Sequence, residues 1–181
     1  MKKRNAFTLA EVLIALVIIG VIASMTIPTL LNNTNSQEYR TALKKSVAVV
    51  NQAVTLHYAL EGKTVADYAT AADLRDSLFA KRLNVVSTGV TTAYKGAGTA
   101  TVVTADGIAY SFQVASACDD SGQTVCYNVF IDVNGDKKPN TLTANTKTPK
   151  DGYQAALYSQ RMVPTGPVTQ GVMYDQGLYY D

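Results

Sequence analysis

The chain has 181 residues, which suits one compact domain with an appendage and is short for two ordinary domains. Hydrophobic residues make up 47% of it, enough to build a buried core. The net charge of +2 depends on the first four residues, because without Lys2, Lys3 and Arg4 the chain carries 13 basic and 14 acidic side chains, or about −1. That balance excludes a general polyanion binder, and DNA binding is not indicated.

A short basic segment, MKKRNA at residues 1–6, precedes an apolar run that begins at Phe7. Residues 12–23 are apolar without interruption, and the run approaches the roughly 20 residues that a membrane-spanning helix needs. A secretory signal or a plain membrane anchor would explain the basic and apolar parts. Neither gives a role to the carboxylate of Glu11, and a carboxylate at membrane depth is functional by default because it is costly there.

A second helical pattern covers residues 36–62. Its apolar side chains recur at steps of three and four, which predicts one stripe along a helix: Tyr39, Leu43, Val47, Val50, Val54 and Tyr58. Ser36 lacks a full capping box, so the pattern favours a continuation of the apolar helix over a new one. A single helix from Phe7 to Glu61 would be roughly 80 Å long. We expect a kink near Pro28 and an end at Gly62.

The remainder of the chain predicts one short helix and then strands. Asp73–Arg82 reads as a helix that turns Leu74, Leu78 and Phe79 inward. Beyond it, β-prone runs separated by Gly, Asp and Asn predict strands at Asn84–Thr88, Ala100–Thr104, Ile108–Ala115, Val125–Val133 and Tyr153–Tyr158. The predicted fold class is α+β, with a long N-terminal α-helix packed on a mainly antiparallel β-sheet.

The segment KRNAFTLAEVLI at residues 3–14 resembles the leader and helix start of the type IV pilins and type II secretion pseudopilins. The resemblance implies that a prepilin peptidase cuts between Ala6 and Phe7 and methylates the new N-terminus at Phe7. It also implies a pilin-like fold, and it places Gly20 and Pro28 where the family commonly has a glycine and a proline that shape the helix. Ala6 departs from the glycine usual before the cut, which predicts slower or less complete processing.

Cleavage would create an ammonium group at Phe7 in an apolar environment, where an isolated charge is very unfavourable. The carboxylate of Glu11 on a neighbouring subunit could neutralise it and so fix the register between bundled helices. The basic residues 2–4 would hold the leader in the cytoplasm and send the C-terminal domain outward. We therefore expect a leader at 1–6, a transmembrane and assembly half of the helix at 7–31, and a globular domain at 32–181.

The resemblance implies a structural fibre subunit in the bacterial inner membrane, with its single pass in lipid before assembly into a periplasmic pseudopilus or an extracellular pilus. Its expected partners are the prepilin peptidase, other pilin or pseudopilin subunits, and an assembly platform with a cytoplasmic ATPase. Two alternatives stay open: a minor pilin that binds DNA or a surface ligand at a fibre tip, and a membrane-anchored protein that never polymerises. An enzyme is not expected, because His57 is the one histidine and no nucleophile–base set or phosphate loop is visible.

Two further features of the outer domain can be read from the sequence. Cys118 and Cys126, with seven residues between them, predict a disulfide in an exported chain, since a metal or redox pair would favour CxxC spacing. The side chains of Asp132, Asn134 and Asp136 could offer oxygen ligands to Ca²⁺, although the spacing is not that of an EF-hand. The alternative is a polar Asx-turn loop that needs no metal, and no other cofactor is expected.

Overall fold

The computed structural model describes residues 7–88, 99–135, 137 and 151–165. The chain divides into two compact units, Met1–Glu38 and Tyr39–Asp181. One helix, α1 (Leu9–Glu61, 53 residues), has residues in both units and continues past residue 36 without a new start, as predicted. Pro28 lies inside α1, and the kink expected there stays a prediction, as does the domain division after residue 31. The leader at 1–6 lies outside the described residues.

The end of α1 has the predicted geometry. Gly62 follows the last helical residue with φ of 66°, in the left-handed region that glycine adopts without steric penalty. Its N–H donates to the carbonyl of Tyr58 at 2.9 Å, which satisfies one of the carbonyls that a helix end leaves unpaired.

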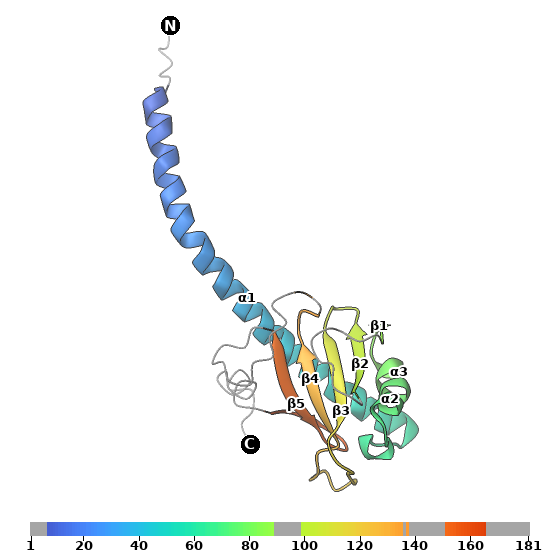
Figure 1. The fold of residues 1–181 in the computed structure, drawn as a ribbon. Coiled ribbons are helices and arrows are strands. Elements are labelled where there is room, and N and C mark those ends of the chain that lie inside the picture. Colours follow the sequence, from blue (N-terminus) through green and yellow to red (C-terminus); the bar gives the residue numbers. More distant parts are fainter. Residues whose placement is uncertain (1–6, 89–98, 136, 138–150, 166–181) are drawn as a thin grey trace. The chain divides into compact units, whose positions relative to one another are not determined.

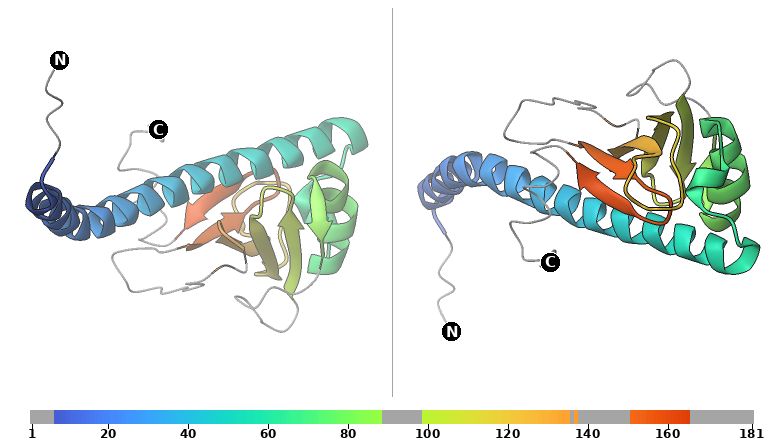
Figure 2. Two further views of the ribbon diagram at one scale, coloured as in Figure 1. Left: turned by 90° about the horizontal axis from the view of Figure 1, so that it is seen from above. Right: turned by 90° about the horizontal axis from the view of Figure 1, so that it is seen from below.

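Within the described residues, the sheet has six antiparallel strands arranged in their order along the chain, so neighbouring strands are also consecutive in the sequence. The strands are β1 (Val85–Ser87), β2 (Thr99–Thr104), β3 (Ala109–Val114), β4 (Tyr127–Asp132), β5 (Gly152–Leu157) and β6 (Met162–Thr165). The first five lie within or beside the predicted runs. In Figures 1 and 2 the part of α1 that belongs to the second unit crosses one face of this sheet. The predicted α+β fold is confirmed, and it is consistent with a pilin-like fold.

The hydrophobic core lies between this part of α1 and the sheet. Strand side chains alternate between two faces, and the register sets the core positions opposite one another. Tyr110 lies opposite Val102 on one side and Ile131 on the other, and all three are buried. The helix contributes four buried side chains of the predicted stripe: Leu43, Val47, Val50 and Val54. Burial of these apolar side chains is the main favourable contribution to the fold.

A short helical segment covers the core beside β2 and β3 (Figure 1). It comprises α2 (Ala71–Leu74), a π-helical turn (Arg75–Phe79) and α3 (Ala80–Arg82). The hydroxyl of Thr70 caps its start by accepting a hydrogen bond from the Asp73 N–H at 3.1 Å. Leu74, Leu78 and Phe79 are buried as predicted. The ring of Phe79 stacks on that of Phe112 with centroids 4.3 Å apart.

Two predictions for the second unit need correction. Tyr58 was expected in the apolar stripe but is 48% exposed, and His57 occupies the buried position in its place. A step of 3.6 residues from Val54 falls between 57 and 58, and a hydrogen bond to Tyr68 selects the histidine. The sequence pattern also gave no sign of β6, because Pro164 argues against a central strand. β6 lies at the sheet edge, where a proline is tolerated.

Candidate assembly site at the N-terminus

The first turn of α1 is closed by a capping box formed by Thr8 and Glu11. The N–H and the hydroxyl of Thr8 each donate to Oε2 of Glu11 at 2.8 Å. The N–H of Glu11 donates back to the Thr8 hydroxyl at 3.3 Å. These bonds satisfy two backbone N–H groups that would otherwise lack partners at a helix start, a deficit that matters most in lipid. Glu11 therefore already has a structural role within its own chain.

Leu9–Pro28 is long and apolar enough to cross a membrane, and none of it is buried within the chain. Glu11 is the one ionisable side chain in this segment. Two other polar side chains satisfy themselves within the helix: the Ser24 hydroxyl donates to the Val21 carbonyl at 2.8 Å, and that of Thr26 to the Ile22 carbonyl at 3.0 Å. The apolar surface of the segment thus has to be covered by lipid or by other protein.

Gly20 lies in the middle of this apolar segment. A Cβ placed on it would meet no atom within 4 Å, so no contact inside the chain requires a glycine there. Small residues in membrane helices let neighbouring helices approach closely. The predicted effects of Gly20 and Pro28 on helix shape stay predictions. So do the cleavage between Ala6 and Phe7 and the methylation of Phe7, and Ala6 lies outside the described residues.

In the second unit, Cys118 and Cys126 are joined by a disulfide, as the sequence predicts. The bond closes the connection between β3 and β4. The loop that it closes is also tied to the segment after α1, because the Thr64 hydroxyl donates to Oδ1 of Asp120 at 2.5 Å. The disulfide loop and the segment that follows α1 therefore lie together at one end of this unit.

The predicted calcium loop is only partly described. Asp132 and Asp151 are both buried, and the Asn134 N–H donates to Oδ1 of Asp132 at 3.2 Å, which is an Asx turn. Oδ1 of Asn134 is buried without a hydrogen bond. Asp136 lies outside the described residues. Within the described ranges, no group of three or more His, Cys, Asp or Glu side chains is arranged to hold a metal ion.

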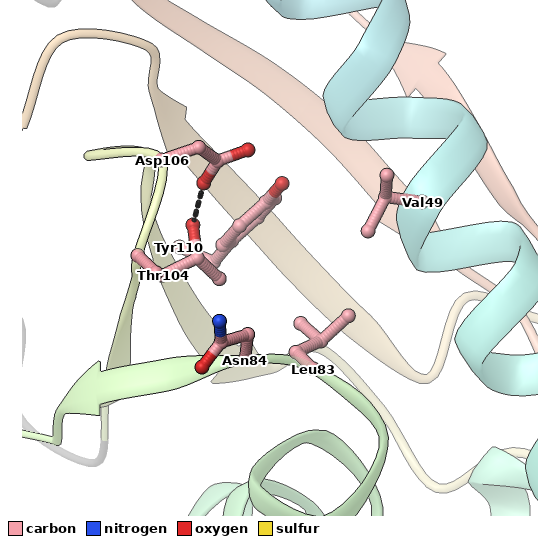
Figure 3. Close-up of a pocket in the computed structure, with 7 residues that line it drawn as sticks. Val49, Leu83, Asn84, Thr104, Asp106 and Tyr110 are labelled. Carbon is pink, nitrogen blue, oxygen red and sulfur yellow. Dashed lines mark hydrogen bonds between the residues drawn. The ribbon is translucent and has the colours of Figure 1, made fainter.

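A cavity of about 370 Å³ opens between α1 and the β2–β3 turn (Figure 3). Its apolar walls come from Val49, Leu83 and Tyr110. Its carboxylate, Asp106, accepts a hydrogen bond from the Thr104 hydroxyl and pairs with Nζ of Lys45 at 2.7 Å. Burial raises the pKa of the Tyr110 hydroxyl, which keeps it neutral. The carboxylate of Asp106 is thus already used in structural contacts with Thr104 and Lys45.

Two residues that the sequence prediction did not single out are important in the structure. Thr8 caps α1, and Thr8 and Glu11 have the T-x-x-E spacing of a capping box, which is a usable signal. Asn51 bonds both backbone groups of Met162, which is 111 residues away, so no local signal could have identified it.

Residues 1–27 match a family model described as the prokaryotic N-terminal methylation motif. The match includes Ala6, Phe7, Glu11 and Gly20, and it ends one residue before Pro28. The comparisons with curated proteins and with solved structures gave no match. What is shown is therefore the prepilin-type motif of type IV pilins and pseudopilins, at the N-terminus of an α+β protein.

Proposed function

From this prepilin motif, we propose that the chain is a structural subunit of a type IV pilus or of a type II secretion-like fibre. The motif supports a pilin-like or pseudopilin-like precursor that the N-terminal helix anchors in a membrane, and it points to a structural role over an enzymatic one. The observation that carries the proposal is the solitary Glu11 in an exposed apolar segment of membrane-spanning length. A carboxylate in that place is costly for a simple anchor and useful for assembly.

Assembly would begin with hydrolysis of the Ala6–Phe7 peptide bond by a prepilin peptidase, followed by methylation of the Phe7 amine. The remaining ammonium needs an anionic partner once helices bundle, and Glu11 of a neighbouring copy would supply it. Glu11 would then exchange part of its bonding with Thr8 for an ion pair between subunits. An assembly platform with a cytoplasmic ATPase would extract the processed subunits from the membrane.

Processing is tested on the full chain in detergent, incubated with a prepilin peptidase and a methyl donor. Intact-mass spectrometry should show the loss of MKKRNA and the gain of one methyl group. Ala6→Gly should be processed faster than the natural chain, because glycine is the usual residue before the cut in the family that the N-terminus resembles. A chain that stays intact, or is cut elsewhere, would contradict the proposed cleavage site.

Assembly is tested by two substitutions at one position. Glu11→Gln removes the charge but keeps the hydrogen-bonding capacity for the Thr8 cap, whereas Glu11→Val removes both. If the charge fixes the register, both variants should be processed and inserted normally, yet both should be lost from fibres sheared off the cells. Normal fibres from Glu11→Gln alone would show that Glu11 acts as a helix cap and that its charge does not fix the register. Normal fibres from both variants would contradict any role of Glu11 in assembly, and absence of the natural chain from sheared fibres would argue for an anchor that never polymerises.

We further propose Ca²⁺ as a ligand of the loop at Asp132, Asn134 and Asp136. The support is chemical: Asn134 Oδ1 is a buried oxygen without a hydrogen bond, next to the buried carboxylate of Asp132. Calcium favours such oxygen ligands. Added Ca²⁺ should raise the urea midpoint of the full chain, and the rise should be absent in Asn134→Ala. An unchanged urea midpoint in the natural chain would contradict Ca²⁺ binding and would favour the alternative, an Asx-turn loop that needs no metal.

A further inference from the structure

His57 is a buried titratable group that has no part in the proposed assembly role. Its imidazole is fully buried near the end of α1. Nε2 lies 2.7 Å from the hydroxyl of Tyr68, and the two rings are tilted against each other with centroids 5.8 Å apart. Nδ1 is buried without a hydrogen bond, and Oε1 of Glu61 lies 3.8 Å from it.

These contacts favour one tautomer of the neutral ring. A neutral imidazole has one N–H donor and one acceptor nitrogen. If the Tyr68 hydroxyl donates to Nε2, the ring proton sits on Nδ1 and faces the carboxylate of Glu61. The opposite tautomer would turn a bare Nδ1 lone pair toward that carboxylate, which is electrostatically worse. The structure therefore favours neutral His57 with its proton on Nδ1.

The surroundings of His57 oppose a second proton. Arg82 Nη2 lies 2.5 Å and Lys81 Nζ 3.8 Å from Oε1 of Glu61, so two cations already compete for this carboxylate. Burial is the largest cause that lowers the pKa of His57 below its ordinary 6.5. Glu61 raises that pKa, whereas Arg82, Lys81 and Lys63 lower it further. Protonation of His57 would therefore add a buried positive charge without a free anion to balance it.

Tyr68, the partner of His57, belongs to the segment 63–70, which connects α1 to α2. The Val65 N–H donates to the Ser159 carbonyl at 2.9 Å, and the Tyr127 hydroxyl donates to the Tyr68 carbonyl. The same segment reaches the disulfide loop through Thr64 and Asp120. The contact between His57 and Tyr68 thus joins the end of α1 to a segment that borders both the disulfide loop and the β5–β6 turn.

We propose that His57 is a proton-operated latch that holds the segment 63–70 against the end of α1 when it is neutral and releases the segment when it is protonated. The inference does not depend on the proposed assembly role. The closed form disfavours a proton on His57. The stabilisation of the closed segment 63–70 is therefore fully present above about pH 6.5, and it decreases as the pH is lowered toward the pKa of folded His57. Below that pKa the loss levels off. Uptake of one proton limits the rise of the opening constant to about tenfold per pH unit.

The first measurement uses the full chain in detergent micelles with isotope-labelled histidine. His57 is the sole histidine, so one NMR signal set reports its pKa and its tautomer directly. We expect a pKa below 6.5 and a proton on Nδ1 in the neutral form. A signal that titrates at 6.5 or above would overturn the proposal.

The second measurement is hydrogen exchange followed by mass spectrometry, between about pH 7.5 and about pH 5. Exchange is corrected for its intrinsic pH dependence, and residues 63–70 are compared with β3 and β4. We expect 63–70 to lose protection on acidification while the strands keep theirs. His57→Gln, which cannot titrate, should remove this pH dependence. Tyr68→Phe should open the segment at neutral pH and leave the titration of His57 in place.

Two outcomes would contradict the latch. In one, the acid-dependent opening of 63–70 is the same in His57→Gln as in the natural chain, which would assign it to carboxylates such as Asp67 and Asp120. In the other, 63–70 and the strands lose protection together, which would mean global unfolding without a local release. If His57→Gln does not fold, the Tyr68→Phe variant and the NMR titration still decide between these outcomes.

Discussion

Asn51 joins α1 to the edge strand β6, and its removal gives a sharp test of how the helix is held on the sheet. Its Oδ1 accepts a hydrogen bond from the Met162 N–H at 2.6 Å, and its Nδ2 donates to the Met162 carbonyl at 3.2 Å. Met162 is 2% exposed, so water has little access to these two backbone groups. A single helix side chain thereby satisfies both backbone groups of one strand residue.

Asn51→Ala would leave a buried donor and a buried acceptor without partners. Each such group costs about 1–3 kcal/mol, and the better helix propensity of alanine returns about 0.5 kcal/mol. We therefore expect the free energy of unfolding of the second unit to fall by about 1.5–5.5 kcal/mol. Asn51→Asp keeps the acceptor and loses the donor, so its effect should be smaller.

The assay is pulse proteolysis of the full chain in detergent micelles across a urea gradient, which reports the folded fraction without requiring α1 to leave the micelle. Gln52→Ala is the matched control, because its exposed side chain on the same helix should change the stability by no more than about 0.5 kcal/mol. An Asn51→Ala variant as stable as Gln52→Ala would refute the reasoning, since it would mean that the Met162 backbone finds other partners at little cost.

Two further predictions concern the disulfide and the membrane segment. Replacing both Cys118 and Cys126 with serine should lower the free energy of unfolding by about 2.5 kcal/mol, the loop-closure value for a sequence separation of 8; urea midpoints equal to those of the oxidised natural chain would contradict it. Gly20→Leu should leave the urea midpoint of the second unit unchanged, because a Cβ there meets nothing within the chain, yet it should reduce recovery in sheared fibres. Normal fibre recovery would show that no close helix contact forms at Gly20.

The helical part of the fold can be predicted from the sequence because its signals are local. The apolar run and the stripe from Leu43 to Val54 determine where α1 lies and which side of it is buried. Gly62 marks its end, and the T-x-x-E spacing that begins at Thr8 marks its start. The candidate assembly site belongs to this local part, and its residues are named from the resemblance of residues 3–14 to the prepilin leader and helix start, so their roles stay predictions.

The contacts that join distant segments cannot be predicted in the same way. The bonds from Asn51 to Met162 and from His57 to Tyr68 depend on how β6 and the segment 63–70 return to α1. The sequence pattern selects Tyr58 over His57 because tyrosine is the more apolar of the two. A period of 3.6 residues cannot itself decide between these adjacent positions at the end of the stripe. Polar partners select the buried residue there, and those partners appear only in the folded chain.

The glycine at position 135, in the loop proposed to bind Ca²⁺, also has a structural explanation that does not involve the metal. Its φ is 65°, and a Cβ on it would lie 2.7 Å from the Gly107 carbonyl oxygen, so this loop packs directly on the β2–β3 turn. Gly62 has nearly the same φ with open space around it. Gly62→Ala should therefore cost about 1–2 kcal/mol from backbone conformation alone, and Gly135→Ala should cost clearly more in the same urea assay. Equal costs would mean that the loop moves away freely. A larger cost at Gly135 without added Ca²⁺ would show that packing on this turn is sufficient to require the glycine. Gly135 would then say nothing about calcium binding, so Asn134 is the position at which calcium has to be tested.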